Sequence, residues 1–194
     1  MRLLKALTAA FFLAYGLLEP ALPLYSRDPL EAGAAGYGLL WTAYGAGMLA
    51  GLLGGGPLLA RGRPGVTFAA LAFAYGALLA PLATLRSLPP ALLCFALVGC
   101  AWGPYSVIET ALFQRLIPPG LRGQVFGARA TVTGAAVALG PALCGVLLQW
   151  LSASGVLGLA ALGCLVMGAV GLLSPTLRRI ERPSAEPERD RGRR

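Results

Sequence analysis

The chain lacks histidine, and only 12% of its 194 residues are charged. Because soluble domains carry about 25% charged residues, this chain has too few charges to cover the surface of a water-soluble fold. The absence of histidine excludes His-based catalytic triads, and no apolar run carries an aspartate for an aspartyl pair. The composition therefore argues against an enzyme, whether soluble or embedded in a membrane.

Cysteine is scarce and is not arranged to hold a metal. The four cysteines, Cys94, Cys100, Cys144 and Cys164, lie inside apolar runs, and none belongs to a CxxC pair. Without histidine partners, this spacing predicts no zinc site and no other metal or cofactor. We expect the cysteines to act as small apolar packing residues.

Hydrophobic residues, in contrast, are abundant and occur in long runs. They make up 57% of the sequence, and the mean hydropathy is +0.71. A helix that crosses a membrane needs about 20 predominantly apolar residues, and charged residues, Pro and Gly divide this sequence into runs of about that length. The runs cover residues 3–25, 35–60, 66–85, 91–113, 125–150 and 156–173. We therefore predict an all-α, polytopic membrane protein with six transmembrane helices.

Residues 178–194 differ in composition from the helical bundle, which we assign to residues 1–177. They contain seven arginines, four acidic residues and two prolines, a composition typical of a disordered segment. This basic tail either contacts anionic lipid headgroups or only sets the topology. Although the net charge of the chain is +8, its basic residues form no stripe on a folded domain, so nucleic-acid binding is not predicted.

Basic residues are distributed unevenly between the two ends of the predicted helices. If both termini are inside, the outer loops hold only Arg27 and Arg86. The inner segments before the tail hold Arg2, Lys5, Arg61, Arg63, Arg115 and Arg122. Since short cytoplasmic loops carry the excess of Lys and Arg in membrane proteins, we expect both termini to be cytoplasmic.

Glu19 is the first of three ionisable residues inside the apolar runs, where each costs several kcal/mol unless it is paired or hydrated. It lies about 12 Å along its helix from Arg27. Pro20 and Pro23 follow it, so its helix is expected to be kinked or broken. Broken helices beside buried charges are typical of substrate and ion sites in transporters. Glu19 is therefore a candidate for a solute and proton pathway; the alternative is a position near the outer lipid headgroups.

The other two ionisable residues, Glu109 and Arg129, are expected to form an ion pair. Glu109 lies about 9 Å inward from Arg115, and Arg129 lies about 10 Å inward from Arg122 on the following antiparallel run. The two side chains therefore reach the same depth. Such a pair either acts as a gate or proton-sensitive latch, or only neutralises two charges, or both side chains extend to the cytoplasmic surface.

Trp102, Tyr105 and Gln114 share the run of Glu109. They are candidates for the same pathway because a cavity that reaches Glu109 would also reach neighbouring positions of that helix. Packing or anchoring at the membrane interface is the alternative for each of them.

Glycines repeat at four-residue spacing on two of the runs. Gly47, Gly51 and Gly55 share one helix face, and so do Gly99 and Gly103. Such small faces let a second helix backbone approach closely. The spacing predicts helix packing, and it is equally compatible with a surface on which helices slide.

Several segments together resemble the major facilitator superfamily. Two of them are residues 37–51 and 114–126, and a third is the basic loop 56–63, with Arg61 and Arg63. This loop is similar to the signature loop between the second and third helices of each half in that family. It carries Ala60 where the family has an aspartate, and it is one residue short.

A further segment, Gly140-Pro141 with Gly145, is similar to the Gly-Pro helix motif of antiporters in the family. Cys144 stands where a glycine is common in that motif. The resemblance covers residues 1–177 and is strongest to the carboxyl-terminal six-helix half of bacterial efflux permeases.

The resemblance implies one half of a transporter of the cell (inner) membrane. It implies efflux of a small amphipathic solute, coupled to protons that Glu19 or Glu109 would carry. The partners would be membrane lipids, the solute, protons and a second six-helix half, supplied either by another copy or by a separate chain. The alternative is a fragment that does not transport, or a six-helix assembly partner.

Overall fold

A computed structural model describes residues 2–55 and 63–175. The described part is all-α, and its helices are α1 (Arg2–Arg27), α2 (Gly33–Gly54), α4 (Pro64–Leu79), α5 (Leu88–Leu116), α6 (Arg122–Leu147) and α7 (Ala153–Leu173). Two short 3-10 helices, η1 (Ala80–Ala83) and η2 (Pro119–Leu121), extend α4 and precede α6. The predicted tail 178–194 and Arg61 lie outside the described residues.

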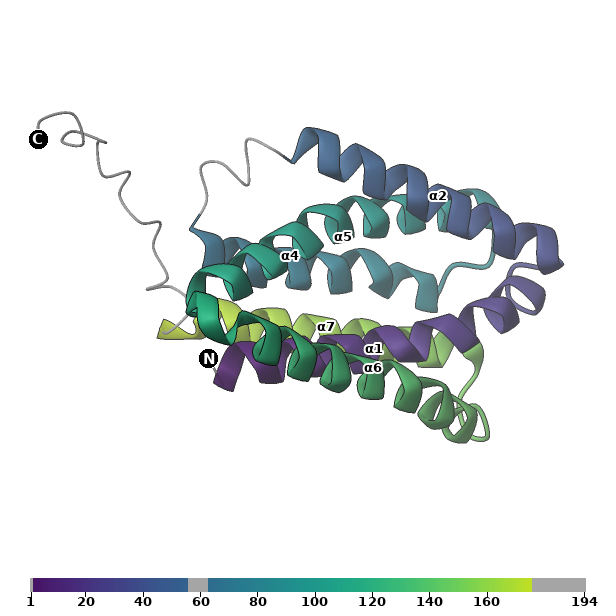
Figure 1. Ribbon diagram of the computed structural model, residues 1–194. Helices are drawn as coiled ribbons and strands as arrows, with labels where there is room; N and C mark the ends of the chain where they lie inside the picture. Colours follow the sequence, from purple (N-terminus) through teal and green to yellow (C-terminus); the bar gives the residue numbers. More distant parts are fainter. Residues whose placement is uncertain (1, 56–62, 176–194) are drawn as a thin grey trace, which may run out of the picture.

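Successive helices run in opposite directions along one bundle (Figure 1). The amino terminus, the start of α4, the connection from α5 to α6 and the end of α7 lie at one end of the bundle. The connections from α1 to α2, from α4 to α5 and from α6 to α7 lie at the other end. We call these the first end and the second end. The prediction of six long antiparallel helices is confirmed.

Five of these helices are long and apolar enough to cross a membrane by length and composition: α1, α4 (with η1), α5, α6 and α7. The remaining helix, α2, is of similar length, but its glycines and its Tyr, Trp and Thr residues lower its mean hydropathy. It ends at Gly54, whereas the sequence predicted an apolar run as far as residue 60. Residues 56–62, which hold most of the predicted signature loop, are not among the described residues.

The helix ends follow local sequence signals. Pro64 and Pro89 lie in the first turns of α4 and α5, where a missing backbone N–H costs nothing. The Ser152 side chain caps α7 by accepting a hydrogen bond from the Gly155 backbone N–H at 3.2 Å. The second end is then tied together by Arg86, which donates to the Ser154 hydroxyl at 2.6 Å.

α1 is continuous from Arg2 to Arg27, although Pro20 and Pro23 lie inside it. We expected the helix to be kinked or broken at these prolines, and the continuous helix shows that it is not broken. Each proline removes one backbone donor, but the packing of α1 against α6 and α7 holds the surrounding turns in place. Transmembrane helices commonly tolerate proline in this way.

The closest helix contact, between α2 and α5, is made through glycines. A methyl group at Gly47 would overlap the backbone carbonyl of Ala96, and one at Gly51 would overlap that of Cys100. Gly103 of α5 meets the backbone of α2 in the same way. The glycine spacing in the sequence thus corresponds to a contact at which two backbones touch.

Single glycines occupy the other main crossings. Gly16 of α1 faces Gly140 of α6, and a methyl group at Gly16 would lie 3.0 Å from the Gly140 Cα atom. Gly76 of α4 and Gly168 of α7 each meet the backbone of the other helix. Two helices therefore hold the bundle together: α1 packs against α6 and α7, and α5 packs against α2 and α4.

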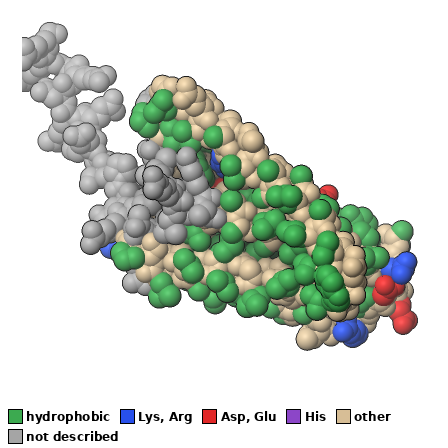
Figure 2. Space-filling view, turned by 90° about the horizontal axis from the view of Figure 1, so that it is seen from below, with side chains coloured by type: hydrophobic (Ala, Val, Ile, Leu, Met, Phe, Trp, Pro, Cys, Tyr) green, Lys and Arg blue, Asp and Glu red, His purple; other side chains and the backbone are tan. Residues whose placement is uncertain are grey.

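The outer surface of the bundle is apolar along most of its length. Figure 2 shows hydrophobic side chains scattered over one long face, with most of the acidic and basic groups gathered at one end. Of the candidate spans, α6 is the least covered, since 11% of its most apolar stretch is buried against 39–50% for the others. This surface requires a membrane or another apolar partner around it.

Candidate functional site

Glu109 of α5 and Arg129 of α6 form a bidentate ion pair. Arg129 Nε donates to Glu109 Oε1 at 3.2 Å, and Arg129 Nη2 donates to Glu109 Oε2 at 2.5 Å. The Glu109 side chain is 2% exposed and that of Arg129 is 21% exposed. The sequence predicted that Glu109 and Arg129 lie at equal depth and form an ion pair, and the structure contains this pair. Its Glu109 side chain is buried.

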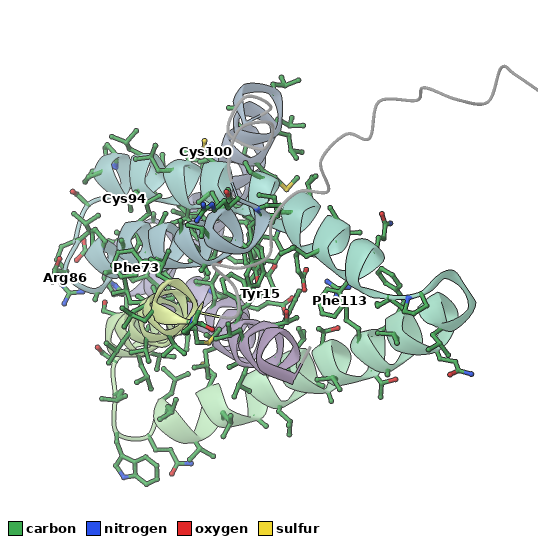
Figure 3. All side chains as sticks on the ribbon, turned by 90° about the vertical axis from the view of Figure 1, so that its left-hand side faces the viewer. Tyr15, Phe73, Arg86, Cys94, Cys100 and Phe113 are labelled. Carbon is green, nitrogen blue, oxygen red and sulfur yellow. The ribbon has the colours of Figure 1, made fainter. Side chains whose placement is uncertain are left out.

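The ion pair connects two helices that otherwise barely touch, because α5 and α6 make few backbone contacts with each other. Phe113 lies between these two helices (Figure 3). The Arg129 guanidinium sits 5.4 Å from the centre of the Phe113 ring, and that ring lies 6.4 Å from the ring of Phe126 on α6. An attraction between guanidinium and ring adds to the ion pair, so Arg129 is central to the α5–α6 connection.

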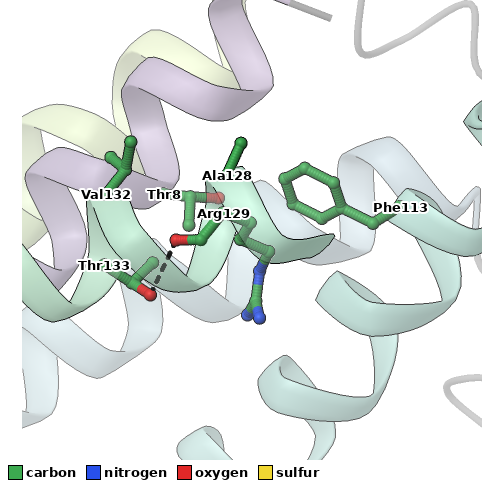
Figure 4. Close-up of a pocket in the computed structure, with 6 residues that line it drawn as sticks. All are labelled: Thr8, Phe113, Ala128, Arg129, Val132 and Thr133. Carbon is green, nitrogen blue, oxygen red and sulfur yellow. Dashed lines mark hydrogen bonds between the residues drawn. The ribbon is translucent and has the colours of Figure 1, made fainter. Parts of the chain in front are cut away.

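A cavity of about 100 Å³ lies beside Arg129 (Figure 4). It is lined by Thr8, Phe113, Ala128, Arg129, Val132 and Thr133. The Thr133 hydroxyl donates to the backbone carbonyl of Arg129 at 2.9 Å. The Thr8 hydroxyl is buried and has no hydrogen-bond partner among the described residues. The cavity therefore offers a polar group and room for small molecules such as water next to the ion pair.

Trp102 and Tyr105, two of the predicted pathway residues, belong to an aromatic cluster between α1, α4 and α5. The Trp102 ring stacks on Tyr15 at 5.4 Å between ring centres and on Tyr105 at 5.5 Å. Phe11 contacts Tyr105 at 4.6 Å and Tyr75 at 5.1 Å. Tyr105 is fully buried and Trp102 is partly buried, so Trp102 stands at the edge of this cluster and Tyr105 in its interior.

Glu19 lies on the exposed side of α1. It follows Tyr15 by one helical turn, so the two side chains share a face. Among the described residues, no hydrogen bond or ion pair joins Glu19 to Glu109 or Arg129. The structure therefore places the two predicted proton carriers in different environments, one buried and paired, the other on a surface edged by aromatic rings.

The remaining predicted residues lie at the edges of the bundle. Gln114 is exposed near the end of α5 and lines an open depression with Ser106, Val107, Thr110 and Ala111. Arg63 is exposed directly before α4. Gly55 ends α2 against Pro104 of α5, and Pro141 is exposed on α6 one residue beyond the Gly16 crossing.

Sequence reasoning did not find Thr8, Phe113, Tyr44 or Tyr75. Phe113 and Thr8 are candidates only because the fold brings α1, α5 and α6 together around Arg129. Tyr44 and Tyr75 could have been found from the sequence, because each places a hydroxyl inside an apolar run. Such a hydroxyl needs a hydrogen-bond partner when it is buried.

Comparison with known proteins places this arrangement in a family. The chain is 29% identical over 182 residues to the multidrug efflux pump Tap of Mycolicibacterium fortuitum, which covers 92% of this chain and 44% of that protein. The chain therefore spans less than half the length of this relative. No solved structure matches the chain. The model of the Major Facilitator Superfamily matches residues 6–194. The chain therefore belongs to the Major Facilitator Superfamily, a family of membrane transporters rather than enzymes.

Proposed function

We propose that this chain forms one six-helix half of a proton-coupled transporter that exports a small amphipathic solute across the cell (inner) membrane. The family and the efflux function of the relative support transport. The chain matches only 44% of the length of that relative, which supports the need for a second half. Many transporters bind their solutes at the interface between two repeats.

The buried Glu109–Arg129 pair is the observation that carries proton coupling. A carboxylate with 2% exposure is held in place by one guanidinium that joins α5 to α6. Protonation of Glu109 removes its charge, which weakens the attraction to Arg129. Because few other contacts join these helices, their separation is the movement that protonation would favour.

The solute surface in this proposal is the aromatic face around Glu19. Tyr15 and Trp102 stack on each other beside it, and the open depression near Gln114 continues along α5. Aromatic rings supply apolar area, and the carboxylate supplies a site that fixes orientation. Glu19 is therefore proposed to bind solute or proton, and Glu109 is proposed to respond to the proton.

The proposed second half would cover the exposed face of α6, supplied either by another copy of this chain or by a separate one. Native mass spectrometry of the tagged chain, purified in mild detergent with whatever it binds, tests this assembly. We expect a complex of two six-helix units. A chain that remains alone in membranes where it shows no transport would instead support the alternative of a non-transporting fragment.

The proposed orientation has the first end, with both termini, in the cytoplasm. Its test uses a variant whose four cysteines are replaced by alanine, with one new cysteine at Ser87 or at Gly120, both of which are exposed. In intact cells, a membrane-impermeant maleimide should label Ser87→Cys and should leave Gly120→Cys unlabelled until the membrane is permeabilised. Labelling in the reverse order would invert the topology.

Glu19→Gln is expected to reduce proton-driven efflux of an amphipathic dye by at least about ten-fold, because the neutral side chain binds no transferable proton. Efflux is measured as the loss of ethidium fluorescence from preloaded cells that lack other efflux pumps. Glu31→Gln is the matched control, since Glu31 is an exposed acid in the connection between α1 and α2. Equal efflux by wild type and Glu19→Gln would remove Glu19 from the pathway.

A further inference from the structure

Several hydroxyl groups are buried in the bundle without a partner. Among the described residues, the side-chain oxygens of Thr8, Tyr44, Tyr75 and Tyr105 are buried and make no hydrogen bond. An unsatisfied buried hydroxyl costs about 1–3 kcal/mol, and folded proteins keep few such groups. In native interiors, ordered water is the usual partner for polar groups of this kind.

These hydroxyls are not scattered; they follow one another across the bundle from the Glu19 surface. Tyr15 lies one helical turn before Glu19 on α1. Its ring lies 5.4 Å from that of Trp102, and the Trp102 ring also lies 6.0 Å from that of Tyr75 and 5.5 Å from that of Tyr105. Tyr44 on α2 is close enough to Tyr15 and to Tyr75 on α4 for both to affect its electrostatics. The Tyr44 and Tyr75 side chains approach each other, although their oxygens do not reach hydrogen-bonding geometry.

The buried thiol of Cys164 on α7 continues this sequence of polar groups. Cys164 packs against α4 beside Tyr75, since a methyl group at the next residue, Gly76, would lie 3.0 Å from the Cys164 Cβ atom, and it is close enough to Tyr75 and Tyr105 to affect the electrostatics of both. Tyr105 interacts with Glu109 and Arg129, and Glu109 lies one helical turn further along α5. We call Tyr15, Tyr44, Tyr75, Cys164 and Tyr105 the polar row; it joins Glu19 to the Glu109–Arg129 pair.

Aromatic packing fixes the positions of two members of the polar row, Tyr75 and Tyr105. The Phe11 ring lies 5.1 Å from that of Tyr75 and 4.6 Å from that of Tyr105, so it holds both tyrosines. Phe68 of α4 stacks on the other side of Tyr105 at 5.0 Å. Rigid rings leave the hydroxyls little freedom to turn away toward other partners.

We infer that the polar row, bridged by internal water molecules, is a proton path between the Glu19 surface and Glu109. This inference rests on the proton coupling in the proposed function. In one transfer, the Glu19 carboxylic acid gives up its proton, and each water, hydroxyl or thiol accepts a proton on one side and releases one on the other. Glu109 becomes a carboxylic acid, Glu19 becomes a carboxylate, and every intermediate group returns to its neutral form.

The groups around Glu109 suit it as the receiving end of this path. Arg129 from α6 forms the ion pair with Glu109, and Tyr105 from α5 delivers the proton. α1 contributes the Thr8 hydroxyl in the adjacent cavity, and the thiol of Cys164 is reached through Tyr105. The ion pair loses its negative member when the proton arrives, so arrival at Glu109 and loosening of the α5–α6 connection are one event.

Water in the polar row is tested by X-ray radiolysis of the purified full-length chain, because hydroxyl radicals formed from bound water oxidise the side chains beside it. Tyr75 and Tyr105 should be labelled at least about five-fold faster than Tyr25. Tyr25 is equally buried, but its hydroxyl donates to the protein, to the Leu85 carbonyl at 3.1 Å. Labelling of Tyr75 and Tyr105 no faster than Tyr25 would overturn the inference.

Proton transfer is tested by infrared spectroscopy in vesicles that hold the chain in one orientation. The C=O band of protonated Glu109 is assigned by its loss in Glu109→Gln. Acid added on the side of the second end should raise this band in wild type, and Tyr75→Phe should slow the rise by at least about ten-fold. Acid added on the side of the first end should give the same rate in both.

The path would be contradicted if acid added on the side of the second end did not raise the C=O band of Glu109. It would also be contradicted if Tyr75→Phe left the rate of this rise unchanged. Neither experiment uses a solute or a transport assay. A failure of the proposed transport would therefore appear in the dye measurement and leave these two results intact.

Discussion

Gly51→Leu is expected to prevent α2 and α5 from packing and thereby to destabilise the whole bundle. Even a methyl group at Gly51 overlaps the backbone carbonyl of Cys100, and a backbone has no flexible side-chain end that can move aside. The helices must separate along their contact, which also pulls Gly47 away from Ala96. We expect a loss of about 3 kcal/mol or more, seen as a large drop in the melting temperature of the purified protein.

Gly45→Leu is the matched control for this substitution. Gly45 lies on the same helix, and nothing occupies the space within 4 Å of an added Cβ atom. The control should melt within a few degrees of the wild type. If both variants melt together at the wild-type temperature, the α2–α5 contact described above is wrong.

Arg129→Met is expected to be the most damaging change at the candidate site. It leaves the 2%-exposed Glu109 carboxylate without its guanidinium, and breaking one side of a buried ion pair costs about 3–5 kcal/mol. It also removes the contact with Phe113 and thus much of the α5–α6 connection. The measurement is the melting temperature in detergent near neutral pH.

The double variant Glu109→Gln with Arg129→Met separates charge from shape. Because it leaves no unpaired charge, it should recover most of the stability that Arg129→Met loses. Ser106→Ala serves as a control on α5, since the Ser106 hydroxyl only donates to the Gly103 carbonyl of its own helix at 2.8 Å. A double variant no more stable than Arg129→Met would show that Glu109 bears no uncompensated charge in the single variant.

The sequence was sufficient for the six helices and for the ion pair, for identifiable reasons. Each apolar run has the length that a membrane imposes, so composition alone marks the spans. Glu109 and Arg129 could be matched because each lies a countable distance from an arginine at the same end of the bundle. A small packing face on α2 was also visible, because Gly47 and Gly51 repeat at helical spacing, but the sequence did not identify α5 as its partner.

Other contacts left no such periodic trace. Gly16 and Gly76 have no partner glycine at four-residue spacing. Only the fold shows that Gly16 meets Gly140 and that Gly76 meets the backbone of Ala161 and Leu165 on α7. Pro20 and Pro23 indicated a kink or a break, and the helix continues unbroken through both of them. The polar row depends on side chains from α1, α2, α4, α5 and α7, so no one segment of sequence contains it.

The central claim is that a proton gradient drives solute movement through a complex that contains this chain. Everted membrane vesicles test it most directly, because their interior corresponds to the outside of the cell. When the interior is made acidic, an amphipathic fluorescent dye should accumulate inside, and a protonophore should release it. Dye that distributes independently of the imposed pH difference, in vesicles shown to hold the assembled complex, would contradict the account.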